Sequence, residues 1–352
     1  MDEEPKKRVS WRRLGLFSII FIALTLAGFY AVFAHFSDRN LTFDDRLLDA
    51  RVIVAAIGLL VIYFVADGLR FYYTLAALGF RIPARVMTKL VFINIFFSNI
   101  TPMATGGGFA QVWFLHDHGV SIGKATAATT IRTVLAIFFI FSFSPIFLLT
   151  LEPLQQSTII GDIQVALALF IVVYLGFFAV VLLRAHWLIT PLLAITRRLN
   201  KLGLISDATA KIWYFRVMRE MLKFSRSFAV YIKGPRRAIA LSVIFTAVFL
   251  LSLFSFPALL MWGLDYNVDY IVSLGLLVVT TFIMYFSPTP GASGISEGVF
   301  GSFFSDILQH QHLLLVTFSW RFLTIYLGMI IGLLVLQRYL IQRSRLLSGA
   351  KL

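Results

Sequence analysis

Long apolar runs recur along the chain and restrict its fold more than any other feature does. Several of them reach about 20 residues, which is the length of an α-helix that crosses a bilayer. Charged residues make up only 14% of the sequence, whereas a soluble domain carries about a quarter. No stretch of useful size reads as a separate soluble domain. The sequence therefore predicts an all-α polytopic membrane protein.

A six-residue element occurs twice and interrupts two of these runs. Thr101–Gly106 (TPMATG) reappears as Thr289–Gly294 (TPGASG), and an apolar segment with one arginine, Arg132 or Arg321, follows each copy at nearly the same spacing. Proline ends the preceding helix, and glycine lets the backbone turn. A repeated helix breaker in membrane segments, with a cation behind it, is typical of transporters built from two related halves.

The distribution of charge predicts on which side each loop lies, because cytoplasmic loops carry an excess of lysine and arginine. The basic turn at 81–89 is expected inside and the acidic loop at 151–162 outside. Two apolar runs separate these loops, and two full crossings would end on the wrong side. The same conflict arises between the acidic loop at 263–270 and the basic C-terminal tail. Both conflicts disappear if each duplicated element is the tip of a re-entrant helical hairpin.

This topology predicts two inverted repeats, residues 1–150 and 151–352, with about eight apolar segments in all. Each repeat has three spans plus one re-entrant hairpin, and both termini are cytoplasmic. The first span is expected at 14–36, where the run is too long for a signal peptide and has no clear cleavage site. Ordinary helices joined by a surface crossing segment are the open alternative to the hairpins.

The hairpin tips and the two arginines are the candidate site for a substrate. An arginine is costly on the lipid face of a span, so it should face the interior, where its guanidinium suits a phosphate. The amides that begin each returning arm suit an anion as well, and Thr105 and Ser293 are expected to be the N-caps of these arms. The substrate-binding residues predicted are Arg132, Arg321, Thr101, Pro102, Thr105, Gly106, Gly107, Gly108, Gln111, Thr289, Pro290, Ser293, Gly294, Ser296 and Glu297.

Alternatives stay open for these residues. The duplicated elements could be plain helix kinks, and each arginine could pair structurally with a carboxylate or with carbonyl groups of a hairpin. Glu297 lies in the first turn after the second element, where it either compensates the helix dipole or pairs with an arginine. A proton-coupling carboxylate is the other interpretation of Glu297. Asn99 is expected to line the same cavity as Gln111.

The remaining polar patterns favour structural interpretations. Asp67 and Arg70 have the spacing of a local salt bridge on one helix. The His-x-His pairs at 116–118 and 310–312 fall on opposite faces and are expected to be surface-loop histidines. The acidic run Asp45–Asp49 is expected to be an ordinary outer loop. Neither a metal site nor a cofactor is predicted, and the absence of cysteine excludes disulfides and thiolate chemistry.

A net charge of +14 raises the question of an anionic partner. Much of this charge lies in the cytoplasmic segment 184–237, beside membrane spans. Such a location indicates anionic lipid headgroups rather than nucleic acid. Within the segment, Lys211–Gly234 alternates aromatic and basic side chains, which suits a helix in the headgroup zone. It is either a passive connector or a region that recruits anionic lipid.

Several of these residues resemble one known family. The stretch Phe96–Gly107, the Gly119–Ser121 turn and Arg132, followed later by Pro288–Gly294 with Glu297, are similar to the lysylphosphatidylglycerol synthase transmembrane-region family. The resemblance covers nearly the whole chain. It implies the membrane domain that, in bacterial multiple peptide resistance factors, is thought to move aminoacylated phosphatidylglycerol between leaflets. It also implies a location in the prokaryotic cell membrane, that is the plasma or inner membrane. The 352 residues contain no synthase domain, so aminoacyl transfer is not expected.

Three functions are compatible with the sequence. The first is a lipid translocase, not an enzyme, that passes an anionic phospholipid or a lipid-linked phosphate headgroup through a cationic mid-membrane cavity. The second is a membrane enzyme acting on a lipid phosphate, although no carboxylate pair lies near the duplicated elements in the sequence. The third is a membrane scaffold that holds a lipid or glycan synthase as its partner.

Overall fold

The computed structural model of the protein describes residues 44–155, 164–183 and 228–349, with a few single positions outside these ranges. These residues form helices and connecting turns, and no β-strand occurs among them. Within the described ranges, four helical stretches are long and apolar enough to cross a membrane: Ala50–Ala77, Ile122–Thr150, Arg236–Gly263 and His310–Arg343. The predicted class, an all-α membrane protein with several spans, is thereby confirmed. The span expected at 14–36 and most of the basic segment 184–237 lie outside the described residues.

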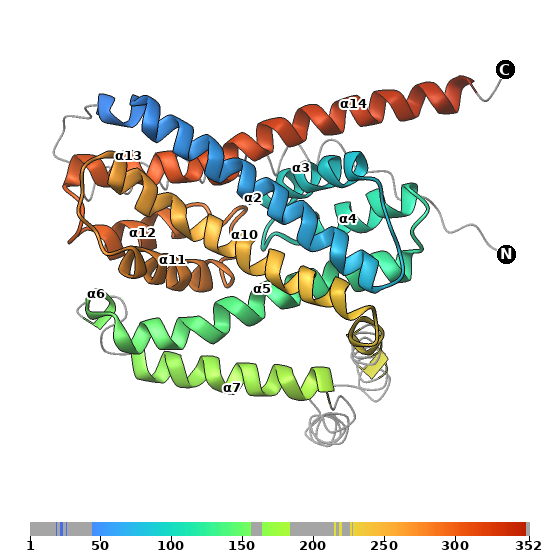
Figure 1. The fold of residues 1–352 in the computed structure, drawn as a ribbon, viewed down its shortest axis with the longest axis horizontal. Helices are drawn as coiled ribbons and strands as arrows, with labels where there is room; N and C mark the ends of the chain where they lie inside the picture. Colours follow the sequence, from blue (N-terminus) through green and yellow to red (C-terminus); the bar gives the residue numbers. More distant parts are fainter. Residues whose placement is uncertain are drawn as a thin grey trace, which may run out of the picture.

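The described residues from Asp44 to Leu183 contain a short 3-10 helix followed by six helices. In chain order they are η1 (Asp45–Leu48), α2 (Ala50–Ala77), α3 (Ala84–Ile100), α4 (Thr105–Asp117), α5 (Ile122–Thr150), α6 (Glu152–Gln155) and α7 (Gln164–Leu183). The helix α7 lies along α5 at one edge of the molecule (Figure 1). The helices α3 and α4 pack against each other on the two sides of the first duplicated element.

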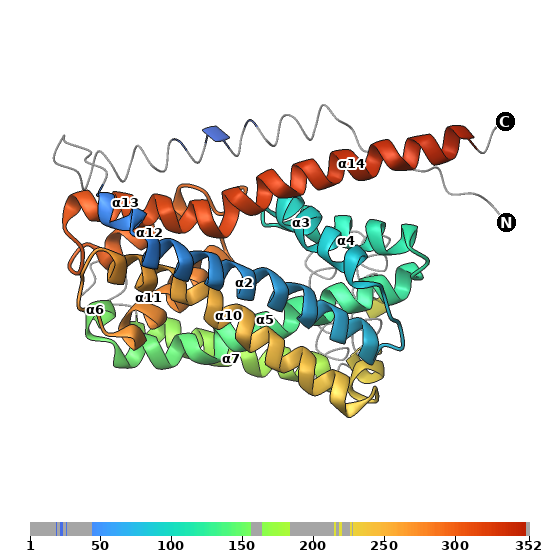
Figure 2. The ribbon, with the colours of Figure 1, turned by 45° about the horizontal axis from the view of Figure 1, so that its top comes forward.

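The described residues from 228 to 349 form the remaining part of the fold. It contains α10 (Arg236–Gly263), α11 (Tyr270–Met284), α12 (Ile295–Phe304), α13 (His310–Arg321), the π-helical turn η2 (Phe322–Tyr326) and α14 (Leu327–Gly349). The helices α11 and α12 pack on the two sides of the second duplicated element. Since α13, η2 and α14 are continuous, they form one long helix that extends beyond the other helices (Figure 2).

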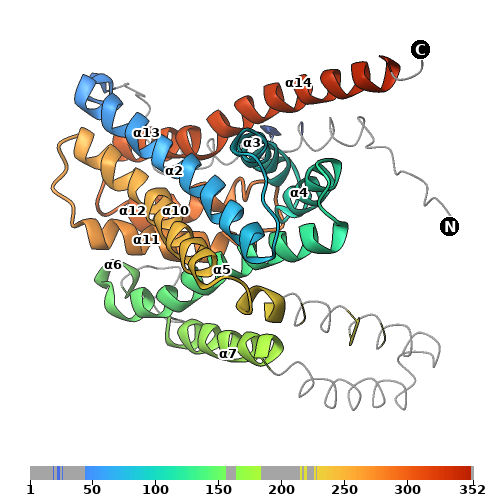
Figure 3. The same ribbon diagram turned by 45° about the vertical axis from the view of Figure 1, so that its right-hand side comes forward.

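The helices α2 and α10 cross the middle of the molecule side by side (Figures 1 and 3). One large apolar core includes side chains of α10, α11, α12 and α13. A second core includes side chains of α3, α4 and the middle of α14. The helix α14 approaches α3 closely at Gly332, where an added Cβ atom would lie 2.3 Å from the backbone oxygen of Phe92. Only glycine allows this contact, so it ties the C-terminal helix to the first half of the chain.

Both duplicated elements form tight turns that end one helix and begin the next. Met103 and Ala104 have φ angles of 53°, and Gly291, Ala292 and Gly294 have φ angles of 57°, 55° and 86°. The left-handed backbone shifts the helix starts relative to the sequence prediction. Ala104 is the N-cap of α4 and Gly294 that of α12, so the prediction of Thr105 and Ser293 as N-caps is wrong.

The two turns also touch each other. Pro102 and Pro290 form an isolated antiparallel bridge between the first and the second element, although nearly two hundred residues separate them in the chain. The elements that are alike in sequence are therefore neighbours in space. This contact places both turns, and the helices on each side of them, around one point of the molecule.

Candidate functional site

A cavity of about 500 Å³ lies beside the two turns. Residues of α2, α3, α4 and α5 line it from the first half of the chain, and residues of α10, α11, α13 and η2 line it from the second. The volume is in the range of pockets that hold small ligands. Both arginines singled out in the sequence, Arg132 and Arg321, line this cavity together.

The first arginine belongs to a buried cluster of three charged side chains. The Nη2 group of Arg132, on α5, donates a hydrogen bond of 2.5 Å to Oδ1 of Asp67, on α2. Arg70, one turn further along α2, donates from Nε to the same oxygen at 2.7 Å. Its guanidinium carbon lies 3.6 Å above the centre of the Phe249 ring on α10. One carboxylate therefore joins two cations, and three helices meet at this point.

The second arginine is paired within its own half. The Nε atom of Arg321 lies 2.9 Å from Oε1 of Glu297, and neither side chain is accessible to solvent. The Nη2 group of Arg321 donates to the backbone oxygen of Gly291 at 2.8 Å. The other oxygen of Glu297 accepts hydrogen bonds from the Gly294 amide at 2.7 Å and from the Ser296 hydroxyl at 2.8 Å. Arg321 and Glu297 together fix the turn and the start of α12.

Several buried donors at the cavity wall have no hydrogen-bond partner among the described residues. They are Nη1 of Arg70, Nε of Arg132, Nη1 of Arg321 and Nε1 of Trp320, and all four residues line the cavity. Buried polar groups are normally satisfied, so a group of donors facing one space calls for an explanation. Since arginine and tryptophan side chains donate and do not accept, an oxygen-rich or anionic ligand would satisfy them.

Uncharged polar side chains of α3 and α4 also line the cavity. Asn94, Ser98 and Asn99 come from α3, and Gln111 comes from α4. Oε1 of Gln111 is buried and has no hydrogen-bond partner in the described part of the chain. Asn99 uses its side-chain amide to donate to the backbone oxygen of Ile95 at 2.8 Å. The cavity thus has a cationic region and a neutral, hydrogen-bonding region.

The structure divides the predicted substrate-binding residues into two groups. Five of them line the cavity: Gly108, Gln111, Arg132, Thr289 and Arg321. The others build or support the turns: Thr101, Pro102, Thr105, Gly106, Gly107, Pro290, Ser293, Gly294, Ser296 and Glu297.

Two backbone amides that the sequence assigned to an anion already have partners within the protein. The Gly106 amide donates to Oγ1 of Thr101 at 2.8 Å, and the Gly294 amide donates to Glu297. Both therefore hold their own turn together.

The sequence interpretation missed the role of α2. It assigned Asp67 and Arg70 to a local salt bridge, which does form, but it did not place either residue beside Arg132. No local pattern could have shown this contact, because it joins helices that are far apart in the sequence. The signal in the sequence that could have indicated it is the presence of several ionisable residues in apolar segments. Each such residue needs a partner in the protein interior.

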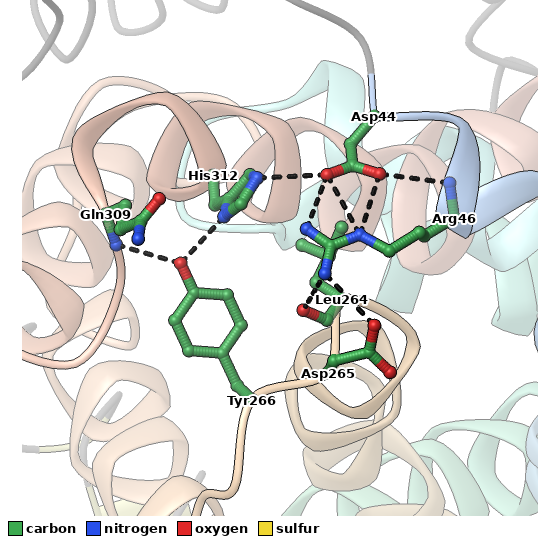
Figure 4. A network of polar contacts seen from close by, with 7 residues as sticks. All are labelled: Asp44, Arg46, Leu264, Asp265, Tyr266, Gln309 and His312. Atoms are coloured by element: carbon green, nitrogen blue, oxygen red, sulfur yellow. Dashed lines mark hydrogen bonds and ion pairs between the residues drawn. The ribbon is translucent and has the colours of Figure 1, made fainter.

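A second polar network lies where α2 begins (Figure 4). Arg46 donates to Asp44 and also contacts Asp265 and the Leu264 carbonyl group. Nε2 of His312 lies 3.2 Å from Asp44, and its Nδ1 lies 2.7 Å from the Tyr266 hydroxyl. His312 is buried at the start of α13, so its prediction as a surface-loop histidine is wrong.

Charge pairing dominates the electrostatics of this network. The hydrogen bonds from Arg46 hold the pKa of the Asp44 carboxyl well below its ordinary value, and Asp44 in turn raises the pKa of Arg46. The network joins the segment before α2 to the α10–α11 loop and to α13. Within the described residues, no cluster of three histidine or carboxylate groups is arranged to hold a metal ion.

Comparisons with known proteins agree with the membrane fold. A UPF0104 membrane protein of Archaeoglobus fulgidus is 21% identical over 282 residues, which cover 80% of this chain and 84% of that protein. The family described as the lysylphosphatidylglycerol synthase TM region matches residues 12–332, which include both duplicated elements and both cavity arginines. The match confirms the resemblance seen in the sequence. This chain belongs to the lysylphosphatidylglycerol synthase TM region family.

Proposed function

We propose that this protein moves an anionic lipid headgroup between the two leaflets of the membrane, without a covalent change in the lipid. The observation that carries the proposal is the cavity at which both duplicated elements and both buried arginines meet. In this proposal, residues 1–150 and 151–352 are inverted repeats whose hairpin tips enter from opposite faces of the cell membrane. The family match supports a role connected with membrane lipids.

The cationic region of the cavity suits a phosphate group. Arg70, Arg132 and Arg321 present donors with no other partner, and guanidinium groups bind phosphate oxygens in a fork geometry. A phosphate at Arg321 would compete with Glu297 for the same guanidinium. Glu297 is therefore expected to weaken phosphate binding and to help release the headgroup.

The side of the cavity near the first turn supports entry from the bilayer. Met103 and Thr133 line the cavity and are exposed, and Met103 has 63% of its surface accessible. The exposed apolar side chains Phe109 and Phe138 lie on the same two helices, α4 and α5, as cavity-lining residues. Exposed apolar side chains on these helices would let lipid tails remain in the hydrocarbon while the headgroup enters. Movement of the two halves against each other would then expose the cavity to each leaflet in turn.

The test is headgroup translocation in reconstituted vesicles. A phosphatidylglycerol with a labelled acyl chain is followed with a membrane-impermeant reagent that detects lipid of the outer leaflet only. Arg132→Gln and Arg321→Gln are expected to slow exchange at least about tenfold, because each removes a charge-assisted contact to phosphate. Arg85→Gln, which changes an exposed arginine outside the cavity, is the matched control.

Folding of each variant is checked by thermal unfolding in detergent before reconstitution. Arg132→Lys and Arg321→Lys provide a second comparison, since they keep the positive charge and lose only the guanidinium fork. Exchange at the wild-type rate in folded Arg132→Gln and Arg321→Gln variants would refute the proposed function.

A further inference from the structure

The balance of charge and donors in the cavity points to one class of ligand, provided that the cavity is the lipid path proposed above. We infer that this class is a lipid phosphodiester with one negative charge and an uncharged, hydroxyl-bearing headgroup. A lipid diphosphate, a phosphate monoester and an amine-bearing lipid are all excluded by the same balance.

The charged side chains at the cavity do not balance one another. Arg70, Arg132 and Arg321 face the cavity, and the carboxylates paired with them are Asp67 and Glu297. Three cations against two anions leave one formal positive charge. A phosphodiester carries a single negative charge and neutralises it. A phosphate monoester carries about −1.5 to −2 at neutral pH, so it would leave a buried negative charge without a partner.

Among the described residues at the cavity, no carboxylate remains for an amine. Asp67 already accepts from two arginines, and Glu297 pairs with Arg321 while it accepts from Gly294 and Ser296. An ammonium group would add a cation to a cavity that already has a surplus of one. The aminoacylated lipid that the family resemblance implies therefore lacks a counter-charge here.

Aromatic faces could bind an ammonium group in place of a carboxylate. The Phe249 ring is occupied, because Arg70 lies above one face and Tyr63 stacks at a centroid distance of 5.0 Å. Trp320 stacks on Phe300 at 4.9 Å. Both Phe249 and Trp320 already contact other side chains of the protein, so an ammonium group would have to compete with these contacts.

The neutral side chains of the cavity wall favour a hydroxyl-bearing headgroup. Asn94, Ser98, Asn99 and Gln111 line it, and none of them carries a charge. The buried Oε1 of Gln111 accepts, while the arginines only donate, so a complementary group must supply a donor next to a phosphate. A hydroxyl group does so without adding charge. In this arrangement the arginines bind the phosphate, and the polar side chains of α3 and α4 contact the hydroxyl-bearing headgroup.

The experiment measures binding rather than transport. The purified full chain in detergent is titrated with phosphatidylglycerol, phosphatidic acid, phosphatidylethanolamine and lysyl-phosphatidylglycerol of identical acyl chains, and complexes are counted by native mass spectrometry. Phosphatidylglycerol is expected to bind at least about tenfold more tightly than each of the others. Equal or tighter binding of either amine-bearing lipid, or of phosphatidic acid, would overturn the inference, as would binding of none of the four.

A substitution sharpens the same experiment. Gln111→Glu adds a carboxylate to the neutral region and cancels the surplus charge, so preference should shift toward phosphatidylethanolamine. Gln111→Met keeps the size and should reduce the preference for the hydroxyl headgroup without such a shift. Ser273→Ala is the control, because Ser273 is also a buried side chain without a hydrogen-bond partner among the described residues but lies outside the cavity lining.

The wild-type titration decides the inference even where a variant fails to fold. Selective binding of phosphatidylglycerol without translocation in vesicles would refute the proposed function and leave the ligand class standing. Translocation without this selectivity would refute the ligand class alone.

Discussion

The buried pair of Arg321 and Glu297 allows a quantitative test of how the second turn is held. Replacing Arg321 by methionine leaves a carboxylate with no solvent access and no cation beside it. Removing one partner of a buried ion pair costs about 3–5 kcal/mol of folding free energy. Glu297 keeps its hydrogen bonds from Gly294 and Ser296, which stabilise the charged form. We therefore expect Arg321→Met to lower the free energy of unfolding by about 3 kcal/mol, near the lower limit of this range.

A double-mutant cycle separates the ion pair from the other contacts. Glu297→Gln alone leaves Arg321 charged and buried without a carboxylate partner, while its hydrogen bond to the Gly291 carbonyl group remains, so it should also destabilise the protein. The double variant Arg321→Met/Glu297→Gln contains no unpaired charge. It should therefore be more stable than the sum of the single changes predicts, by about 2 kcal/mol.

The assay is unfolding by a denaturing detergent in mixed micelles, followed by circular dichroism for all four members of the cycle. Arg338→Met is the control on the same long helix, because Arg338 is exposed, and it should change the free energy of unfolding by less than about 0.5 kcal/mol. The reasoning is refuted if Arg321→Met is as stable as this control, or if the two single changes are additive.

Two further predictions concern helix packing and pH. Gly332→Ala should destabilise the protein by about 1–3 kcal/mol, because its Cβ atom would meet the backbone oxygen of Phe92. Gly58→Ala is the control and should be neutral or stabilising, because no atom lies within 4 Å of the added Cβ atom. Unfolding of both variants in micelles checks this prediction. Arg46 lowers the pKa of Asp44, so the contribution of Asp44 to stability is complete above its ordinary pKa of 3.8 and is lost as pH falls below that value. Asp44→Asn should therefore flatten the acid limb of a plot of melting temperature against pH, and an unchanged acid limb would contradict the assignment.

Much of the fold could be predicted from local rules. The long apolar helices follow from the length and composition of the runs, and the breaks at Pro102 and Pro290 follow from proline chemistry. The similar amino-acid sequences of the two elements predict that they are related. The two elements contact each other in the structure. The inverted repeats and the depth of the turns in a membrane stay predictions.

The rest depended on tertiary contacts that no sequence pattern encodes. The start of each returning helix moved by one residue, because a left-handed residue precedes it. His312 was expected in a surface loop but lies buried between Asp44 and Tyr266, which come from distant parts of the chain. Asp67 looked like a local partner for Arg70, although its hydrogen bond to Arg132 is what brings α2 to the cavity.

The two turns are alike in sequence but differ in how charge is held beside them, and this difference locates the surplus positive charge. In the second half, Glu297 follows the turn and pairs with Arg321, so this half is neutral at the cavity. The equivalent position in the first half is Phe109, whose side chain is 78% exposed and could not hold a buried carboxylate beside an arginine. In the first half, Asp67 on α2 is the carboxylate that pairs with Arg132, and Asp67 also pairs with a second arginine, Arg70. The unbalanced cation therefore belongs to the first half, beside the turn that contains the exposed Met103. An anion in the cavity would neutralise this cation, and it would share Arg321 with Glu297.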